Sequence, residues 1–474
     1  MPLNDDTHAG RVARYALVNP NWDFTGSTYF GCRDPHTPLE LLFAAQKIAG
    51  RGHDSLLIDA QTDGLTLDET RRRVADYAPD FLVIPSAPSY LFWRCPPPEL
   101  RVPREWFDGL ASAVSGKGVS EEHRARRAVK VLVGPHGSAT PAAALRKSGA
   151  DAVIRGECED ALAALADEPW ELIDGLCFRR HDGRNGEHDG LNGERGEHYS
   201  TSLAVVDMQT LAALDYANYS VEKHWHRHHV FDHSSNPGSG RGAEVEFARG
   251  CPWNCTFCNK QLFRNKFRER PVEAVLLEVD RLIARGVDYI YFIDEIFGVG
   301  KNVLRLLEEI ARRPVRIGFQ TRIDLWDEEK LDLLGRAHTI SIECGVESIT
   351  ESGREGLNKN CRMSTERIGE LLIYARQRIP WVQANLILTE HDDRDEIRRW
   401  QERLKAEGVW VSEPVPMYPF PGSPLYVQTF GAQPDDSAWE RAHHYYTAAF
   451  NDKGYSDIQE QRPAALEELE KRSA

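Results

Sequence analysis

Short apolar runs alternate with amphipathic helical patterns along most of this 474-residue chain. A helix follows most of the runs in residues 1–182, so the pattern predicts βαβ units and therefore a parallel sheet. One helix is expected over Thr37–Ala49, with Thr37 as its N-cap and Pro38 at its first position. Such a doubly wound α/β domain binds ligands at the carboxyl ends of its strands. The expected strands are Arg14–Val18, Ser55–Asp59, Phe81–Ser86, Val129–Gly134 and Ala152–Gly156.

The alternation resumes after residue 240 with six further strand–helix units. In the helix expected over Pro271–Arg285, apolar residues recur at the 3.6-residue period, and Gly286 ends the pattern. Six successive units predict a barrel or partial barrel, in which catalytic groups lie at the carboxyl ends of the strands. The final residues are expected to form a small helical cap. The six expected strands are Ala243–Ala248, Asp288–Ile293, Val315–Gln320, Thr339–Cys344, Trp381–Leu388 and Val409–Val415.

Two polar segments lie between these halves of the chain. Gly183–Tyr199 is rich in Gly, Asn, His and acidic residues, which is typical of a solvated loop or linker. Lys223–His233 is rich in histidine, but its spacing matches no known metal-binding scheme. We therefore interpret it as a polar linker.

Composition narrows the class of protein. Hydrophobic residues make up 41% and charged residues 28%, as in globular proteins. No apolar run approaches the ~20 residues that span a bilayer. The start of the chain lacks the basic and apolar regions of a signal peptide, so a cytoplasmic protein without a membrane partner is expected. The net charge of −15 argues against nucleic acid as a partner.

Three of the nine cysteines fall within eight residues, directly after the first expected barrel strand. Cys251, Cys255 and Cys258 have the spacing C-x3-C-x2-C. Three thiolates on one short loop can bind three irons of a [4Fe–4S] cube, whereas a fully ligated cube has four cysteines. One iron would then stay open for another ligand. A structural zinc site, the alternative, needs four ligands in paired blocks, and no partner block follows.

At these residues the sequence resembles the radical S-adenosylmethionine (radical SAM) enzymes. The resemblance implies that the open iron chelates the amine and carboxylate of SAM. It also implies that an electron from the cluster cleaves SAM to a 5′-deoxyadenosyl radical. A small electron-transfer protein such as a flavodoxin or ferredoxin would supply that electron. Phe257 matches the aromatic residue that lies near the adenine in this family.

Further residues that match the family follow the second, third and fourth barrel strands. Asp294 and Glu295 would bind the SAM amine; an acidic pair that caps the next helix is the alternative. Arg322 suits the SAM carboxylate, because a guanidinium fork pairs well with a carboxylate. Glu347 and Ser348 resemble the family's G-x-E-S segment and would reach the ribose or the methionine part. The implied SAM contacts are Phe257, Asp294, Glu295, Gln320, Arg322, Glu343, Glu347 and Ser348.

The whole chain resembles the radical SAM enzymes that carry an N-terminal cobalamin-binding domain. Val133–Gly137 and Arg155–Glu159 are similar to the V-G-G-x-H and R-G-E-G-E segments of that subfamily. Pro419–Tyr426 is similar to its P-x-P-G-T-x-L-Y segment. Glycines would let the backbone approach the corrin and its nucleotide tail. The implied cobalamin contacts are Ser86, Gly134, His136, Gly137, Gly156 and Glu157.

The resemblance also suggests the state of the cobalt. Cobalamin domains that ligate cobalt through histidine carry D-x-H-x-x-G, but here Leu39 stands where the glycine should be. We therefore expect the lower cobalt face to be free of His36. The expected domains are a Rossmann-like cobalamin-binding domain over 1–182, a linker over 183–240, a radical SAM partial barrel over 241–430 and a helical cap over 431–474.

The two implied cofactors favour a cobalamin-dependent radical SAM C-methyltransferase. Through methylcobalamin and a 5′-deoxyadenosyl radical, it would methylate an unactivated carbon of a small polar metabolite. The alternative keeps both cofactors but catalyses a rearrangement, a cyclisation or an oxidation. A methylthio-transferase is disfavoured, because Cys32, Cys95, Cys158 and Cys177 form no second cluster motif. A sensor without turnover is disfavoured by the intact three-cysteine motif.

Overall fold

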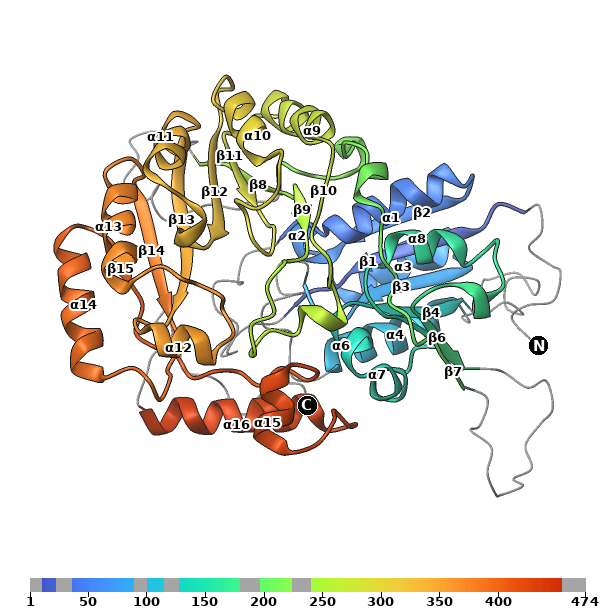
Figure 1. Cartoon of the computed structure of the whole chain (residues 1–474). Helices are drawn as coiled ribbons and strands as arrows, with labels where there is room; N and C mark the ends of the chain where they lie inside the picture. The colour runs from blue at the N-terminus through green and yellow to red at the C-terminus, as the bar shows by residue number, and fades with distance from the viewer. Residues whose placement is uncertain are drawn as a thin grey trace. The chain divides into compact units, whose positions relative to one another are not determined.

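The chain forms two compact units in the computed structural model (Figure 1). Unit 1 comprises Met1–Asp23, Pro38–Val206 and Pro434–Ala438, and unit 2 comprises Phe24–Thr37, Asp207–Gln433 and Trp439–Ala474. The structure describes residues 11–22, 36–88, 100–114, 128–179, 197–223 and 240–453. Cys32 and Cys95 lie outside these ranges. Most of the polar segments Gly183–Tyr199 and Lys223–His233 also lies outside them.

Unit 1 is built on a seven-stranded sheet in the order β2-β1-β3-β4-β5-β6-β7. The first five strands of the chain are parallel, and their order is that of a doubly wound fold, which confirms the predicted fold class. The last two strands run antiparallel and were not predicted. The strands are β1 (Arg14–Asn19), β2 (Asp54–Asp59), β3 (Phe81–Pro85), β4 (Val129–Val133), β5 (Ala152–Ile154), β6 (Leu176–Arg179) and β7 (Glu197–Tyr199).

One helix start differs from the prediction. Helix α1 begins at Leu39, and its N-cap is Pro38, which has no side chain able to cap. Thr37 was expected to be this cap, but its hydroxyl donates to Oε2 of Glu244 at 2.8 Å instead. The helices of unit 1 are α1 (Leu39–Gly50), α2 (Ala60–Asp63), α3 (Leu67–Tyr77), α4 (Arg101–Val114), α6 (Pro135–Ala139), α7 (Pro141–Ser148) and α8 (Glu159–Ala164).

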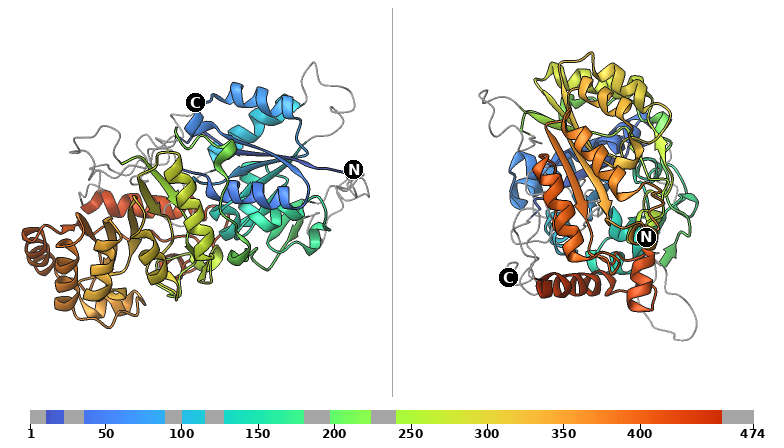
Figure 2. Two further views of the ribbon diagram at one scale, coloured as in Figure 1. Left: turned by 90° about the horizontal axis from the view of Figure 1, so that it is seen from above. Right: turned by 60° about the vertical axis from the view of Figure 1, so that its left-hand side comes forward.

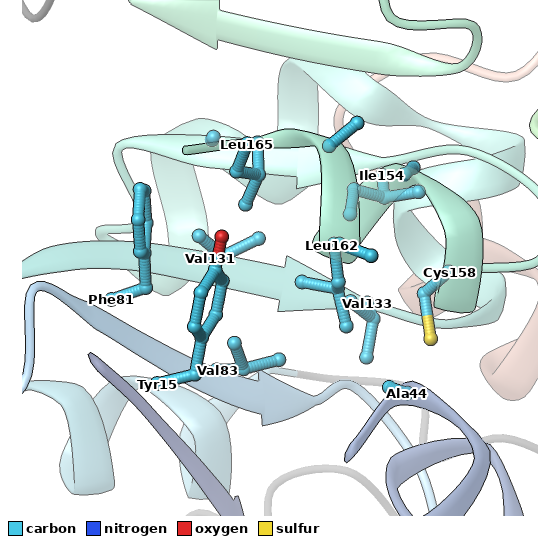
Figure 3. Packing of buried hydrophobic residues seen from close by; sticks show 14 of the residues in the cluster. Tyr15, Ala44, Phe81, Val83, Val131, Val133, Ile154, Cys158, Leu162 and Leu165 are labelled. Carbon is cyan, nitrogen blue, oxygen red and sulfur yellow. The ribbon is translucent and has the colours of Figure 1, made fainter. Parts of the chain in front are cut away.

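The core of unit 1 lies between its sheet and the helices α1 and α8. Figure 3 shows the centre of this core, where Tyr15 and Val131 from the sheet lie beside Leu162 of α8. The ring of Tyr15 stacks on that of Phe81, with centroids 4.6 Å apart. Burial of these apolar side chains is the main contribution to the stability of the sheet. The carboxyl edge of this sheet is the candidate ligand site.

Unit 2 is built on six parallel strands in the order β15-β14-β13-β12-β11-β8. This arrangement confirms the prediction of six successive βα units. Helices lie along one face of the sheet (Figure 2). The strands are β8 (Gly242–Val245), β11 (Tyr289–Phe292), β12 (Arg316–Thr321), β13 (Thr339–Glu347), β14 (Trp381–Leu386) and β15 (Trp410–Val411). The helices are α9 (Val272–Ala284), α10 (Val303–Ile310), α11 (Glu328–Arg336), α12 (Glu351–Gly356), α13 (Thr365–Arg376), α14 (Arg394–Ala406), α15 (Pro424–Phe430) and α16 (Ala438–Lys453).

The two faces of this sheet differ in polarity. Phe292, Phe319 and Ile342 share one face at matched register and are fully buried. Gln320 and Glu343, each one residue further along its strand, share the opposite face at matched register. Because side chains alternate along a strand, the sheet turns an apolar face to its helices and a polar face away from them.

The first barrel strand is shorter than predicted. The expected strand Ala243–Ala248 divides into β8 and a second strand, β9 (Ala248–Arg249), which pairs antiparallel with β10 (Arg268–Glu269). The backbone amides of Phe247 and Ala248 turn from the six-stranded sheet to the carboxylate of Asp294. That side chain therefore ends the first strand. No helix within the described ranges is long and apolar enough to cross a membrane.

We predict that Leu17→Ala destabilises the protein by about 2–5 kcal/mol, because Leu17 is fully buried in the core of unit 1. Leu172→Ala is the matched control, since Leu172 is 74% exposed, and should change stability by at most about 0.5 kcal/mol. Urea unfolding followed by circular dichroism measures both. Equal losses in the two variants would contradict the packing described.

Candidate functional site

The three clustered cysteines lie on one loop between β9 and β10, immediately after the first strand of the six-stranded sheet (Figure 1). The antiparallel pairing of β9 with β10 closes the base of this loop. Gly250 has φ of 79°, and a Cβ there would lie 2.1 Å from the carbonyl oxygen of Lys266. The turn into the loop therefore requires glycine. The loop carries the half-buried residues Cys251, Cys255, Phe257 and Cys258.

Hydrogen bonds connect the cysteine loop to segments that are distant in sequence. The amide of Thr256 donates to the carbonyl of Leu357 at 3.0 Å, and the side-chain amide of Asn358 donates to the carbonyl of Asn254 at 2.7 Å. The carbonyl of Thr256 accepts from the amide of Leu425 at 2.9 Å. These contacts hold the backbone on both sides of the second cysteine.

Burial raises the pKa of all three thiols, that of Cys258 to about 12. The ammonium of Lys260 opposes this shift at Cys251 and Cys258, and that of Lys359 opposes it at Cys255. The thiols of the metal-free loop are therefore protonated at neutral pH. Metal binding would displace these protons, since the thiolate is the metal ligand.

The donor set is three thiols on one short loop, which suits an iron–sulfur cluster. Among the described residues, no three His, Cys, Asp or Glu side chains are grouped as they would be around one metal ion. In an iron–sulfur cube each cysteine binds a different iron, so the sulfurs need not converge on one point. Three half-buried thiols on one short, held loop meet that requirement.

Asp294 and Glu295 follow β11 and hold the start of the cysteine loop. Asp294 accepts from the amides of Phe247 and Ala248 at 2.8 and 3.0 Å, and Glu295 accepts from the amide of Gly250 at 2.8 Å. Burial and the neighbouring carboxylates raise the pKa of Asp294, although its backbone hydrogen bonds oppose the shift. Both acids thus accept hydrogen bonds from backbone amides at the start of the cysteine loop, which is a contact that neither predicted role included.

A buried ionic network beneath the loop escaped the sequence analysis. Arg264 donates to Glu246 at 2.8 Å and to Glu295 at 3.0 Å, and Arg249 donates to Glu246 at 2.8 Å. Burial opposes ionisation of Glu246, yet Arg249 and Arg264 lower its pKa overall. These residues lie outside the cysteine motif, and their pairing depends on the hairpin, so the sequence gives no local signal for it.

Arg322 follows β12 and sits against the cysteine loop. Its fork donates to both carboxylate oxygens of Asp324 at 3.0 and 2.6 Å, and its third nitrogen donates to the carbonyl of Lys359 at 2.7 Å. The guanidinium carbon lies 4.3 Å from the ring centroid of Trp253, within the loop. Asp324 therefore holds the fork that the sequence analysis assigned to the SAM carboxylate.

The remaining SAM candidates lie on the polar side of the sheet and at the end of β13. Gln320 donates to Glu343 across neighbouring strands at 2.8 Å, and both are half-buried. Glu347 has φ of 68° and pairs with the ammonium of Lys359 at 3.4 Å. The structure thus brings Gln320 and Glu343 together and adds Lys359, which no motif had indicated.

Ser348 is held by an acid that the sequence analysis missed. Its hydroxyl donates to Asp392 at 2.8 Å, and Asp392 also accepts from the amide and hydroxyl of Thr350 at 3.1 and 2.9 Å. Thr389 donates to the second oxygen of Asp392 at 2.8 Å. The loops after β13 and β14 are thereby joined.

In unit 1, several predicted cobalamin contacts share one edge of the sheet. Ser86 follows β3, Gly134 follows β4 and Gly156 follows β5, at the carboxyl ends of three neighbouring strands. Ser138, which was not predicted, links two of them, because its hydroxyl accepts from the amide of Gly156 at 2.9 Å and donates to the carbonyl of Gly134 at 3.0 Å. The amide of His136 donates to the Ser86 hydroxyl at 3.4 Å.

Two of the predicted glycines have a reason within unit 1 itself. A Cβ on Gly156 would lie 2.3 Å from the carbonyl oxygen of Ala204, and one on Gly137 would lie 2.2 Å from a methyl of Val153. Glu157 accepts from the amide of Val206 at 2.8 Å. These residues anchor the 204–206 segment to the sheet, whatever ligand the edge binds.

His36 lies in unit 2 and is buried. Its Nδ1 is 2.6 Å from Oε1 of Glu244 on β8, and the amide and hydroxyl of Thr37 donate to the other oxygen. The Glu244 carboxylate therefore holds both His36 and Thr37. Asp34, the other side chain in the D-x-H pattern, lies outside the described residues.

Comparison with known proteins shows what this chain is similar to. A sequence model described as the radical SAM superfamily matches residues 245–401. The chain is 24% identical over 87% of its length to an anaerobic magnesium-protoporphyrin IX monomethyl ester cyclase of Cereibacter sphaeroides, and spans 63% of that protein. It is 29% identical over 37% of its length to a hopanoid C-3 methylase of Methylococcus capsulatus, and spans 35% of it.

Two solved structures share the fold across both units. One is the radical SAM methyltransferase TsrM of Kitasatospora setae, with a TM-score of 0.62 and 17% identity, which covers 88% of this chain and 75% of that one. The other is the cobalamin-dependent SAM radical enzyme OxsB, with a TM-score of 0.67 and 14% identity, which covers 94% of this chain and 67% of that one.

We predict that Asp324→Asn destabilises the metal-free protein by about 3–5 kcal/mol at neutral pH, because it leaves Arg322 buried without its counter-charge. Burial opposes ionisation of Asp324, but Arg322 lowers its folded-state pKa overall. The pair therefore stabilises the protein above the unfolded pKa of about 3.9, and this contribution is lost as pH falls through the lower folded value.

Urea unfolding of parent and variant across the acid range measures this difference. The gap between them should be full at neutral pH and shrink below about pH 4. Asp395→Asn, which breaks an exposed pair with Arg398, is the control and should cost at most about 1 kcal/mol. A gap for Asp324→Asn that is independent of pH would contradict the ionic pairing.

Proposed function

We propose, from the match of residues 245–401 to the radical SAM superfamily, that this chain is a cobalamin-dependent enzyme that methylates an unactivated carbon of a small polar metabolite. The observation that carries the proposal is a three-cysteine loop at the carboxyl end of the first strand of a six-stranded parallel sheet. The same chain carries a doubly wound sheet, and its fold across both units is that of TsrM and OxsB.

In this proposal Cys251, Cys255 and Cys258 hold a [4Fe–4S] cluster. When bound, the cluster supplies the electron that cleaves SAM, and cobalamin supplies the methyl group. The chain supplies position: Asp294 and Glu295 hold the loop, and the buried network beneath it keeps water from that side. An electron donor such as a flavodoxin or ferredoxin would approach from outside.

The proposed SAM site uses the side chains that the loop network leaves accessible. Phe257, Gln320, Glu343 and Glu347 are half-buried, so they can contact a ligand. Asp294, Glu295, Arg322 and Ser348 are engaged in holding loops, and we propose that they act on SAM by fixing the residues around it. Arg322 would reach the SAM carboxylate directly if Asp324 released its fork.

For cobalamin we propose the edge of unit 1 formed by the ends of β3, β4 and β5. Ser86, Gly134 and His136 supply a hydroxyl, an open backbone conformation and an imidazole there. Gly137, Gly156 and Glu157 stabilise this edge through their close contacts with Val153, Ala204 and Val206. The pairing of His36 with Glu244 is consistent with a lower cobalt face that is free of histidine.

A small polar substrate agrees with the polar side of the barrel sheet. Gln320, Glu343, Gln383 and Asn385 lie there on three neighbouring strands, and the Gln383 amide donates to Asn385 at 2.7 Å. Carboxamides and a carboxylate together offer both donors and acceptors to a substrate. They would orient it without committing the site to one metabolite.

The second candidate function keeps both cofactors and transfers no methyl group. The similarity to magnesium-protoporphyrin IX monomethyl ester cyclases, which extends over 87% of this chain for one of them, favours this alternative. It would be a cyclisation, a rearrangement or an oxidation. The two functions differ in how many SAM molecules each product consumes and in what becomes of them.

We predict that Cys255→Ala loses the cluster and reductive cleavage of SAM to 5′-deoxyadenosine, because one of three iron ligands is removed. Anaerobic reconstitution followed by iron and sulfide analysis measures the first effect, and chromatography of the nucleoside the second. Cys177→Ala is the control, since Cys177 is buried in β6 of unit 1. This variant should keep about four irons per chain. Full iron content in Cys255→Ala would overturn the assignment.

The experiment that separates the two functions counts SAM products. Reconstituted enzyme is incubated with SAM and a strong reductant, with and without cobalamin. Methyl transfer predicts release of S-adenosylhomocysteine in an amount that matches bound cobalamin. Production of 5′-deoxyadenosine with no cobalamin-dependent S-adenosylhomocysteine would favour the non-methylating alternative.

A further inference from the structure

The segment Leu357–Asn360 forms a clamp on the cysteine loop. Its carbonyl at Leu357 accepts from Thr256, and the side chain of Asn358 donates to the carbonyl of Asn254. Arg322, stacked on Trp253 of the loop, donates to the carbonyl of Lys359. Three consecutive residues of the clamp thus hold three points on or against the loop, so their own positions are fixed to that of the cysteines.

The backbone on both sides of Lys359 is strained. Asn358 and Asn360 have φ of 52° and 53°, in the left-handed region, and so does Glu347 with 68°. These are three of the five non-glycine residues with positive φ in the described part of the chain. Such a backbone conformation at a non-glycine residue persists where the surroundings determine it. Here it is concentrated on Lys359 and on its partner Glu347.

The Lys359 side chain is buried against the loop. It is 4% exposed, and its Nζ is 3.4 Å from Oε1 of Glu347. A Cβ on Gly345 would lie 2.3 Å from Oε1 of Glu347, so glycine leaves room for the carboxylate that pairs with the ammonium. The backbone places it beside the second cysteine, because the amide of Thr256, next to Cys255, donates at 3.0 Å to the carbonyl of Leu357, two residues before Lys359. A buried cation thus lies in the clamp, next to the part of the loop that carries Cys255.

We propose that Lys359 is a positioning residue that sets the reduction potential of the cluster through its charge. The inference rests on the proposed function, in which the loop holds a [4Fe–4S] cluster. One-electron reduction adds a negative charge to a centre that its thiolates already make anionic. A fixed cation nearby, screened little by water, favours the reduced form and raises the potential. Glu347 offsets part of that effect while it holds the ammonium.

Potentiometric titration of the reconstituted enzyme without SAM, followed by electron paramagnetic resonance, tests the proposal. Lys359→Met should lower the ratio of reduced to oxidised cluster at a fixed potential by about tenfold, which is ~59 mV for one electron. Lys359→Arg should stay within threefold of the parent. Glu347→Gln should shift the ratio the other way, since it removes the offsetting charge. Lys330→Met, at an exposed pair with Asp327, is the control without effect.

Each outcome decides the question. A ratio for Lys359→Met within threefold of the parent, at equal iron content, would overturn the inference, and so would a shift of Glu347→Gln in the same direction as Lys359→Met. If Lys359→Met binds no iron, the sign of the Glu347→Gln shift decides. A parent protein that binds no cluster would overturn the proposed function itself, whereas a cluster with a potential independent of Lys359 would overturn this inference alone.

Discussion

The geometry of the cysteine loop depends on one buried carboxylate. Asp294 takes the amides of Phe247 and Ala248 away from the six-stranded sheet, and this ends the first strand and starts the hairpin that carries the loop. A buried carboxyl group without hydrogen-bond partners would be costly, so these two amides stabilise its position. The next residue, Glu295, fixes Gly250, from which the first cysteine follows.

The rest of the site extends this arrangement from strand to strand. Glu246 and Arg264 form a buried ion pair next to the loop. Arg322 contacts the loop at the ring of Trp253 and the clamp at the carbonyl of Lys359. Removing one partner of such a pair leaves a buried charge uncompensated, which is why the loop tolerates few changes below it. The thiols are held at the end of the sheet in a setting where metal binding must displace protons. The same buried ion pairs therefore hold the loop in place and set the charge around its thiols.

Local patterns in the sequence predicted the sheets, the six-unit half and the cysteine loop, because alternation and short spacing are visible in a single chain. Thr37 could not be placed, since its partner Glu244 lies more than two hundred residues away. The ion pair of Arg264 with Glu295 was missed for the same reason, since the two residues lie 31 positions apart. The three-residue strand β7 was missed because so short a segment at the end of a polar stretch has no measurable period. Long-range pairing of charges is what sequence periodicity does not encode.

The central claim is that three cysteines hold a cluster with one iron open to SAM. Electron–nuclear double resonance on the reduced, reconstituted enzyme tests it most directly, with SAM that carries nitrogen-15 in its amino group. The account predicts a nitrogen-15 coupling to the cluster that appears on addition of labelled SAM and is absent with unlabelled SAM. A reduced cluster whose spectrum shows no such coupling when SAM is bound would contradict it.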